Sequence, residues 1–239
     1  ATFITRLCYE QVAVDLCLHD LPVRLIGNGG GYVYAPLGAT HQSIEDLAIM
    51  RALPNMTVTA ACDADEMTRL MEASLEWPHP MYIRLAKGGD PIISDGSRGF
   101  EIGRAVDMTG EAGQGADVLL VSTGVATTQA LSASQGLVEE GITCRLLHLH
   151  TVKPIDTEAL VEAAASARLV VTVEEHTVVG GLGSAVLETL SDGLDHMPKL
   201  RRLGIPDRFS ENYGSQADLM GACGFDAEGI QATVVRALT

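Results

Sequence analysis

Aromatic residues are scarce in this sequence: only 4% of its 239 residues are Phe, Trp or Tyr, and one is Trp. Hydrophobic residues make up 46%, so any core must be formed mainly from Ala, Val, Leu and Ile. A chain of this length accommodates two compact α/β units, each large enough to bury its own core. We therefore expect two domains.

Basic residues are also few. The chain has 16 Lys and Arg against 31 Asp and Glu, which gives a formal net charge of -15. This charge repels a phosphate backbone over the whole surface and argues against a nucleic-acid partner. Any site for a phosphate group must be local.

The cysteines are few, odd in number and widely spaced: Cys8, Cys17, Cys62, Cys144 and Cys223. Without a C-x-x-C pair, they indicate reduced thiols rather than a disulfide framework or a zinc site. The first six residues contain no basic segment followed by an apolar one, and no apolar run is long enough to span a bilayer. We expect a cytoplasmic protein with no membrane contact, although an upstream segment would change this interpretation.

Apolar segments with helical and strand periodicity alternate along the chain, which predicts an α/β fold of mainly parallel sheets flanked by helices. In the first half we expect helices over 5–19, 43–53 and 64–77, and strands over 23–26, 56–60 and 81–85. In the second half we expect strands over 118–122, 143–149 and 169–173, helices over 127–140 and 156–167, a helix from Ser184 and a strand near Leu203.

A stretch of weak periodicity separates the two halves. Residues 87–100 contain four glycines and a proline, which is typical of a linker. We therefore expect one domain over 1–90, a linker over 91–100 and a second domain over 101–239.

His41 lies between a glycine-rich loop, 27–38, and an expected helix start. A histidine there can transfer protons or hydrogen-bond a substrate hydroxyl near neutral pH. The alternative is that its ring only caps backbone groups at the helix entry. The local pattern leaves both open.

The same stretch carries a resemblance to a known family. Gly38-Ala39-Thr40-His41-Gln42 and the residues after it resemble the pyrimidine-binding domain of transketolases and of deoxyxylulose-phosphate synthase, and later motifs resemble the transketolase C-terminal domain. The matching segments lie in the family's order over nearly the whole chain, at 38–46, 51–56, 80–84, 149–156, 173–176 and 180–183.

The resemblance implies roles for individual residues. Phe3 matches an aromatic ring that packs against the aminopyrimidine of thiamine diphosphate, and Arg6 lies close to the same ring. His41 matches the histidine that faces the reacting carbon and the hydroxyls of the donor. Arg84 matches an arginine that holds the sugar phosphate, for which a planar bidentate donor is suited. The alternatives are a core residue for Phe3 and a surface salt bridge for Arg84.

The sequence also departs from the family pattern. A second phosphate-contacting histidine of transketolases falls on Gly29, and an aspartate near the donor falls on Leu37. Tyr34, or Tyr32, is the candidate to line the altered pocket. The C-terminal domain is expected to support the dimer rather than the chemistry.

The family's catalytic glutamate lies upstream of the segment that matches Phe3, and Glu10, within the following helix, is no substitute. Either a first segment precedes Ala1 or the site lacks an essential group. We expect the former, because a pyrimidine-binding domain without its first strand would leave sheet edges and apolar surface uncovered.

The family's diphosphate-binding motif, Gly-Asp-Gly followed by Asn, is absent from the sequence. The resemblance thus implies the C-terminal subunit of a transketolase-like transferase, in which a diphosphate-binding partner subunit or domain binds most of the thiamine diphosphate and Mg²⁺. Two such chains would form the dimer within a heterotetramer that transfers a ketol unit between sugar phosphates. The alternatives are a deoxyxylulose-phosphate-synthase-like or 2-oxoacid dehydrogenase β-type activity, or a non-catalytic scaffolding subunit.

Two further patterns are weaker evidence for a binding site. His148 and His150 alternate on one expected strand and share a face, but without a third ligand they indicate packing rather than a metal site. Gly180 to Gly183 lacks the spacing of a dinucleotide-binding loop, so we expect close helix–strand packing there.

Overall fold

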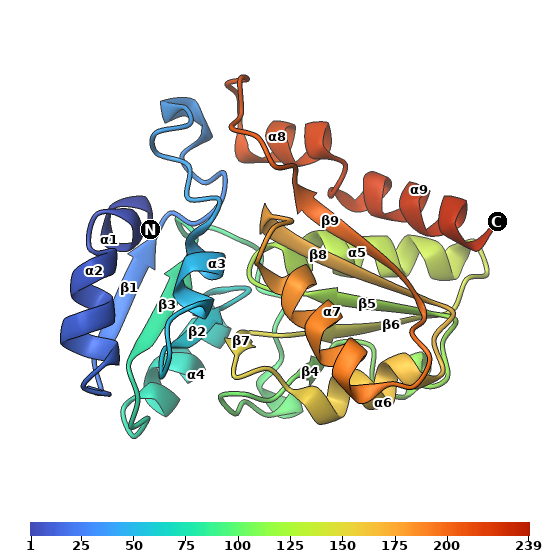
Figure 1. Ribbon diagram of the computed structural model, residues 1–239. Helices are drawn as coiled ribbons and strands as arrows, with labels where there is room; N and C mark the ends of the chain where they lie inside the picture. Colours follow the sequence, from blue (N-terminus) through green and yellow to red (C-terminus); the bar gives the residue numbers. More distant parts are fainter.

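The computed structural model describes the backbone of residues 1–239 and all side chains except those of 111 and 112. Two sheets form the molecule, a four-stranded one of order β1-β3-β2-β7 and a five-stranded one of order β4-β6-β5-β8-β9 (Figure 1). No helix of the described residues has the length and apolar character needed to cross a bilayer.

The first sheet combines both halves of the sequence. Its elements are α1 (Thr2–Arg6), α2 (Tyr9–Gln11), the π-helical η1 (Val12–Cys17), β1 (Arg24–Asn28), η2 (Ala35–Leu37), α3 (Asp46–Arg51), β2 (Thr57–Ala60), α4 (Ala64–Ser74) and β3 (Met81–Leu85), followed by η3 (Gly96–Arg98). β1, β3 and β2 run parallel, whereas β7 (Thr151–Lys153), from the second half of the chain, joins β2 antiparallel.

The second sheet has the predicted parallel centre. Its elements are β4 (Val106–Asp107), η4 (Gly110–Gly113), β5 (Val118–Ser122), α5 (Ala126–Glu139), β6 (Cys144–His148), α6 (Thr157–Ala165), β8 (Leu169–Thr177), α7 (Leu182–Gly193), β9 (Lys199–Ile205), α8 (Gln216–Cys223) and α9 (Ala227–Leu238). Only the short edge strand β4 is antiparallel to its neighbour.

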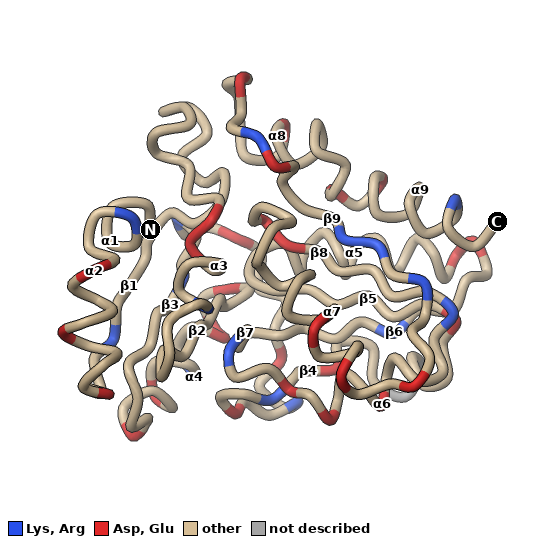
Figure 2. Tube along the Cα trace, in the orientation of Figure 1, with Lys and Arg blue, Asp and Glu red and all other residues tan. Residues whose placement is uncertain are grey.

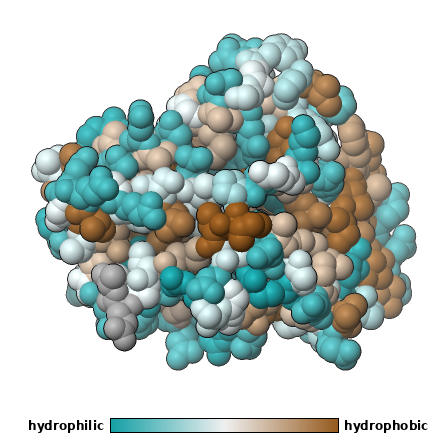
Figure 3. Space-filling view, turned by 180° about the vertical axis from the view of Figure 1, so that it is seen from behind, coloured by the Kyte–Doolittle hydropathy of each residue, from teal (hydrophilic) through white to brown (hydrophobic). Residues whose placement is uncertain are grey.

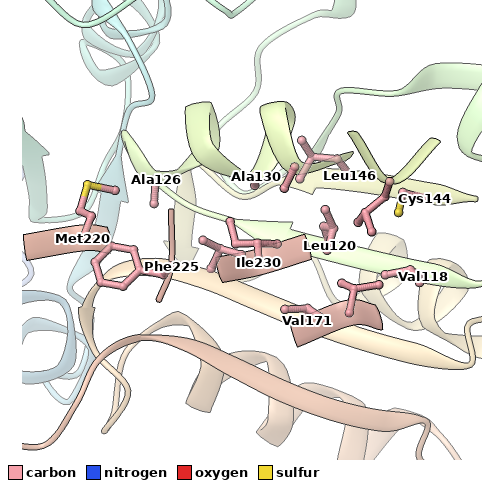
Figure 4. Packing of buried hydrophobic residues seen from close by; sticks show 14 of the residues in the cluster. Val118, Leu120, Ala126, Ala130, Cys144, Leu146, Val171, Met220, Phe225 and Ile230 are labelled. Atoms are coloured by element: carbon pink, nitrogen blue, oxygen red, sulfur yellow. The ribbon is translucent and has the colours of Figure 1, made fainter. Parts of the chain in front are cut away.

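Strand alternation divides the core of this sheet between two helical layers. Val118 and Leu120 of β5 pack beneath α5, α8 and α9 (Figure 4), whereas Leu119 and Val121 face α6 and α7. Because both faces are covered, β5 is apolar along nearly its whole length. That continuous apolar run is why its bounds could be predicted from the sequence.

The expected helix over 5–19 is not one regular helix. It begins earlier, at Thr2, and is interrupted between α1 and α2 before it continues as η1. The wider π-helical turn places Val12 and Cys17 on the same buried face against α3 and β2. Burial of these two side chains explains why the regular 3.6-residue period is lost.

The expected strand over 143–149 is likewise divided. β6 ends at His148, the chain turns, and β7 starts at Thr151 in the other sheet. At the turn, Leu149 N donates to Ser122 O at 2.8 Å and Ala60 N donates to His150 O at 2.8 Å. This turn joins the two sheets.

Charge is distributed unevenly. Acidic residues occur over both halves, whereas Lys and Arg form a run along β9 (Figure 2). β9 is an edge strand, and charged side chains on such an edge discourage pairing with another sheet.

Candidate functional site

The glycine-rich loop that precedes His41 follows β1 at the carboxyl end of the first sheet, where α/β proteins commonly bind ligands. Gly29 N and Gly30 N both donate to Leu85 O, at 2.9 and 3.0 Å, which ties the loop to the end of β3. Gly31 exchanges backbone hydrogen bonds with Ser43, at 2.7 and 3.2 Å. The loop is therefore held at both ends.

Phe3 and His41 lie together beside this loop. Their ring centroids are 5.6 Å apart in an edge-to-face arrangement, and Thr2 Oγ1 donates to His41 O at 3.3 Å. The Phe3 residue is 55% exposed, so it is not a core residue. Thr40 Oγ1 lies 3.0 Å from His41 Nδ1, which leaves His41 Nε2 as the ring nitrogen for another partner.

Arg6 holds the segment that carries His41. Its guanidinium forms a bidentate ion pair with Glu45, with Nη2 2.8 Å from Oε2, and Nη2 also donates to Gln42 O at 3.2 Å. The hydrogen bond to Glu45 raises the pKa of Arg6. Because Glu45 balances its charge, Arg6 here positions the backbone on the C-terminal side of His41.

Arg84 occupies the interior. It is 6% exposed, its Nε lies 3.0 Å from Asp46 Oδ2, and its Nη2 donates to Ser43 O and Glu175 O at 3.1 and 2.8 Å. The expected alternative of a surface salt bridge is wrong, because Arg84 lies between α3 and β8 and both faces of β3 are covered. Tyr82 Oη also donates to Asp46 Oδ2, at 2.7 Å, which completes the network.

Glu175, on β8, extends this network to the glycine-rich loop. Its carboxylate accepts from Tyr32 N at 2.7 Å and from Gln216 Nε2 at 2.9 Å. Burial raises the pKa of the Glu175 carboxyl to about 7. Through Arg84 and Glu175, the loop is coupled to the second sheet.

Tyr34 is half-buried over the glycine-rich loop, and Asn28 Nδ2 donates to its hydroxyl at 3.4 Å. Leu37, at the aspartate position of the family, is 56% exposed. The structure thus brings Phe3, Arg6 and His41 together, with Tyr34 nearby on the loop, whereas Arg84 lies in the interior.

A cavity of about 420 Å³ opens beyond Asn28, at the carboxyl ends of β1, β2 and β3. Its lining includes Asp63, Lys87 and the glycines at 88 and 89. Lys87 is exposed, and among the described residues that line the cavity it is the one cation. From the sequence, Lys87 was expected only to belong to a linker; the signal for a site residue is a cation in a glycine-rich segment directly after a strand.

The glycines at 180–183 serve packing, as predicted. Leu182 N and Gly183 N, at the start of α7, donate to the Glu174 carboxylate at 2.7 and 2.8 Å. A Cβ on Gly181 would lie 2.0 Å from Glu174 Oε2. A carboxylate of the same chain therefore takes the position that a phosphate takes in nucleotide-binding loops.

The fold and this edge define a class: two tandem α/β units with a ligand edge at the carboxyl ends of parallel strands. Two family models match the chain, "Transketolase, pyrimidine binding domain" over residues 1–89 and "Transketolase, C-terminal domain" over residues 111–230. The chain therefore belongs to the transketolase family.

Individual relatives agree with this assignment. The chain is 35% identical, over 98% of its length and 73% of the relative's, to an apulose-4-phosphate transketolase subunit of Phocaeicola vulgatus. It is 37% identical to 1-deoxy-D-xylulose-5-phosphate synthase 1 of Geobacter sulfurreducens, over 97% of this chain but only 36% of that enzyme. A solved structure described as a split gene transketolase, inactive beta4 tetramer, superposes with a TM-score of 0.88 at 37% identity, over 99% of this chain and 74% of that one.

These matches confirm three predictions: the family, the two-domain α/β fold, and a transketolase-type transferase subunit. Transketolases generally use thiamine diphosphate and a divalent metal ion, and the description of these relatives as subunits and split-gene products implies a partner subunit.

Proposed function

We propose that this chain is the C-terminal subunit of a thiamine-diphosphate-dependent transketolase that transfers a ketol unit between sugar phosphates. It acts with a diphosphate-binding subunit, as a dimer within a heterotetramer. Its domains span 1–90 and 101–239, joined by the linker 91–100. The free state of all five cysteines supports a cytoplasmic location.

The observation that carries this proposal is the pair formed by Phe3 and His41. An exposed ring is suited to pack against an aminopyrimidine, and the histidine beside it has a free Nε2 for a substrate hydroxyl. Phe3 and Arg6 would hold the ring portion of thiamine diphosphate, which when bound supplies a carbanion equivalent. His41 hydrogen-bonds the donor and transfers a proton at Nε2.

The described residues match only part of this cofactor. The ring finds an apolar partner in Phe3, whereas the charge of Arg6 is already balanced by Glu45. A diphosphate requires cations or a bound metal ion, which supports assignment of that portion to the partner subunit.

Two cations near the glycine-rich loop and the cavity are candidates to bind the substrate phosphate. Arg84 remains a prediction from the resemblance, but its contacts to Asp46, Ser43 and Glu175 are all internal. Lys87 is exposed at the 420 Å³ cavity and can approach an anion without loss of another contact. We assign the phosphate contact to Lys87. Arg84 lies deeper in the molecule, where it positions the glycine-rich loop.

An apolar surface supports the partner assignment. Apolar side chains are exposed on the side of the molecule formed by α1, η1 and β1 (Figure 3). Its members are Phe3, Leu7, Val14, Leu18, Leu21 and Ile26, between 40% and 75% exposed. A contiguous apolar surface next to a site is typical of a subunit interface.

The experiment is an activity screen of the full-length chain mixed with its diphosphate-binding partner, thiamine diphosphate and Mg²⁺. Turnover of ketose phosphate donors is expected. Turnover of pyruvate with an aldehyde acceptor would instead favour a deoxyxylulose-phosphate-synthase-like reaction, for which the 37% identity to that enzyme is the specific argument. Complex formation without turnover of any ketose or 2-oxoacid donor would support the scaffolding alternative.

A further inference from the structure

A buried cluster of metal-binding side chains lies between the two halves of the chain. Cys62 lies in the turn between β2 and α4, Glu66 lies in the first turn of α4, and His148 ends β6 of the other sheet. Cys62 Sγ, a Glu66 carboxylate oxygen and a His148 ring nitrogen all lie within 4.8 Å of one another. Glu66 Oε2 is 2.9 Å from His148 Nε2, and the side chains of this pair are 2% and 0% exposed.

The donor types and their spacing match zinc. Thiolate, imidazole and carboxylate are the ligands that Zn²⁺ takes in proteins, and ligand atoms around a tetrahedral zinc lie roughly 3.3–3.6 Å apart. The three atoms in the cluster, all within 4.8 Å of one another, therefore need only small side-chain shifts to reach this spacing.

His148 and Glu66 form hydrogen bonds of the kind that orient metal ligands in other proteins. Thr127 Oγ1 lies 2.8 Å from His148 Nδ1, which directs Nε2 into the cluster. Cys62 N donates to Glu66 Oε2 at 2.7 Å and fixes the carboxylate. The Cys62 thiol also hydrogen-bonds the Glu66 carboxylate, so its sulfur already lies beside the oxygen ligand.

A second observation is independent of these three residues. His150 is fully buried, stacks on Phe100 with ring centroids 4.3 Å apart, and its ring centroid is 6.0 Å from that of His148. Its Nε2 has no hydrogen-bond partner within the part of the chain that is described, although its Nδ1 lies 2.9 Å from Thr151 Oγ1. A buried ring nitrogen without a partner is costly unless it binds something.

We propose that Cys62, Glu66 and His148 bind one zinc-type divalent cation that cross-links the two halves of the chain, and that the His150 ring, which lies outside this group of three, turns toward the cation to supply the fourth ligand. On binding, the Cys62 thiol loses its proton to solvent and sulfur bonds to the metal. His148 Nε2 releases to solvent the proton that it directs at Glu66 and coordinates the cation, while Nδ1 carries the ring proton and donates it to Thr127 Oγ1. Thiolate and carboxylate together balance the charge of the cation.

The test uses the full chain freed of metal with a chelator, and Co²⁺ as a spectroscopic probe. We expect one Co²⁺ per chain, a thiolate-to-cobalt charge-transfer band, and displacement of cobalt by Zn²⁺. Cys62→Ser should lose the band. Cys144→Ser, which alters another buried thiol in the core of the five-stranded sheet, should keep it. No band with the native chain, or the same band in Cys62→Ser, overturns the proposal.

A second variant covers the case in which Cys62→Ser does not fold. His150→Ala should keep the charge-transfer band but weaken Co²⁺ binding roughly tenfold or more, and it should reduce the rise in melting temperature that Zn²⁺ gives the native chain. Unchanged Co²⁺ affinity in His150→Ala would overturn the four-ligand site. These measurements do not depend on enzymatic activity, so they are independent of the proposed function.

Discussion

The ring of Tyr34 lies against the backbone of Gly29, so that a Cβ at position 29 would be 2.1 Å from Tyr34 Cε2. Gly29 also has a φ of 78°, which favours glycine. The resemblance to transketolases places a phosphate-contacting histidine at this position. Gly29 and Tyr34 are therefore linked by packing: the ring occupies the space that a side chain at position 29 would need.

Gly29→Ala tests this linkage. We expect a loss of about 2–4 kcal/mol in the free energy of unfolding, because left-handed backbone strain adds to overpacking against Tyr34. Gly88→Ala is the matched control, since Gly88 has a φ of 93° but nothing within 4 Å of the added Cβ, and it should cost only about 1 kcal/mol. Urea denaturation measures both, and equal losses would contradict the linkage.

The two candidate phosphate cations can be separated by kinetics and stability together. Arg84→Ala should destabilise the chain by about 3–5 kcal/mol, because it leaves Asp46 buried without its partner. Lys87→Ala should leave stability within about 0.5 kcal/mol and raise KM for phosphorylated donors, but not for unphosphorylated ones. If Lys87→Ala affects both kinds of donor equally, Lys87 does not contact the phosphate.

Glu175 should make stability fall as pH rises. Burial raises its pKa from an ordinary value of 4.5 to about 7, so between these values the unfolded chain loses a proton that the folded chain keeps. Ionisation therefore favours the unfolded state by up to about 3 kcal/mol above pH 7. Glu175→Gln, which can still accept from Tyr32 N, should remove this loss.

Urea denaturation of native and Glu175→Gln chains at pH 5 and pH 8 checks the sign. The variant should gain stability relative to the native chain on going from pH 5 to pH 8. Glu66 provides the opposite case: burial raises its pKa, but His148 more than offsets this and lowers it to about 2. Ionised Glu66 therefore contributes to the free energy of unfolding above pH 4.5, and this contribution is lost only as the pH falls toward 2. If the native chain instead gained stability relative to Glu175→Gln between pH 5 and pH 8, the raised pKa of Glu175 would be contradicted.

The parallel centre of the fold could be predicted because each strand is a short apolar run. β5 matches its predicted bounds, since Val118 to Val121 are buried on both faces. β7 could not be predicted, because its three residues form a strand only through pairing with β2, which lies in the other half of the sequence. The same limit applies to the division of β6 from β7 at Leu149 and His150.

The geometry of the candidate site was predictable where it is set by local sequence. The loop, the helix start and His41 lie in one short segment, and α1 meets them through Thr2 and Phe3. The inward direction of Arg84 was not predictable, because it depends on Asp46 and on Glu175, which is 91 residues away. Burial of a charged side chain is decided by tertiary partners that a single segment does not contain.

His41 should affect turnover more than folding. In the enzyme reconstituted with its partner, His41→Ala should lower kcat by roughly 10- to 1,000-fold, as expected for a positioned proton donor or hydrogen-bonding group. Its ring is only half-buried and makes no inter-sheet hydrogen bond among the described residues, so the free energy of unfolding should change little. Unchanged turnover with a ketose donor would leave only the capping alternative.

The isolated chain should bind thiamine diphosphate very weakly. Phe3 offers a surface for the ring, but the charge of Arg6 is balanced by Glu45, and Lys87 alone cannot neutralise a diphosphate on a chain of net charge -15. Titration calorimetry with cofactor and Mg²⁺ should give no measurable heat until the diphosphate-binding subunit is added. Phe3→Ala should then weaken binding to the complex, because ring packing is lost. Micromolar binding by the isolated chain would place the diphosphate site within this chain.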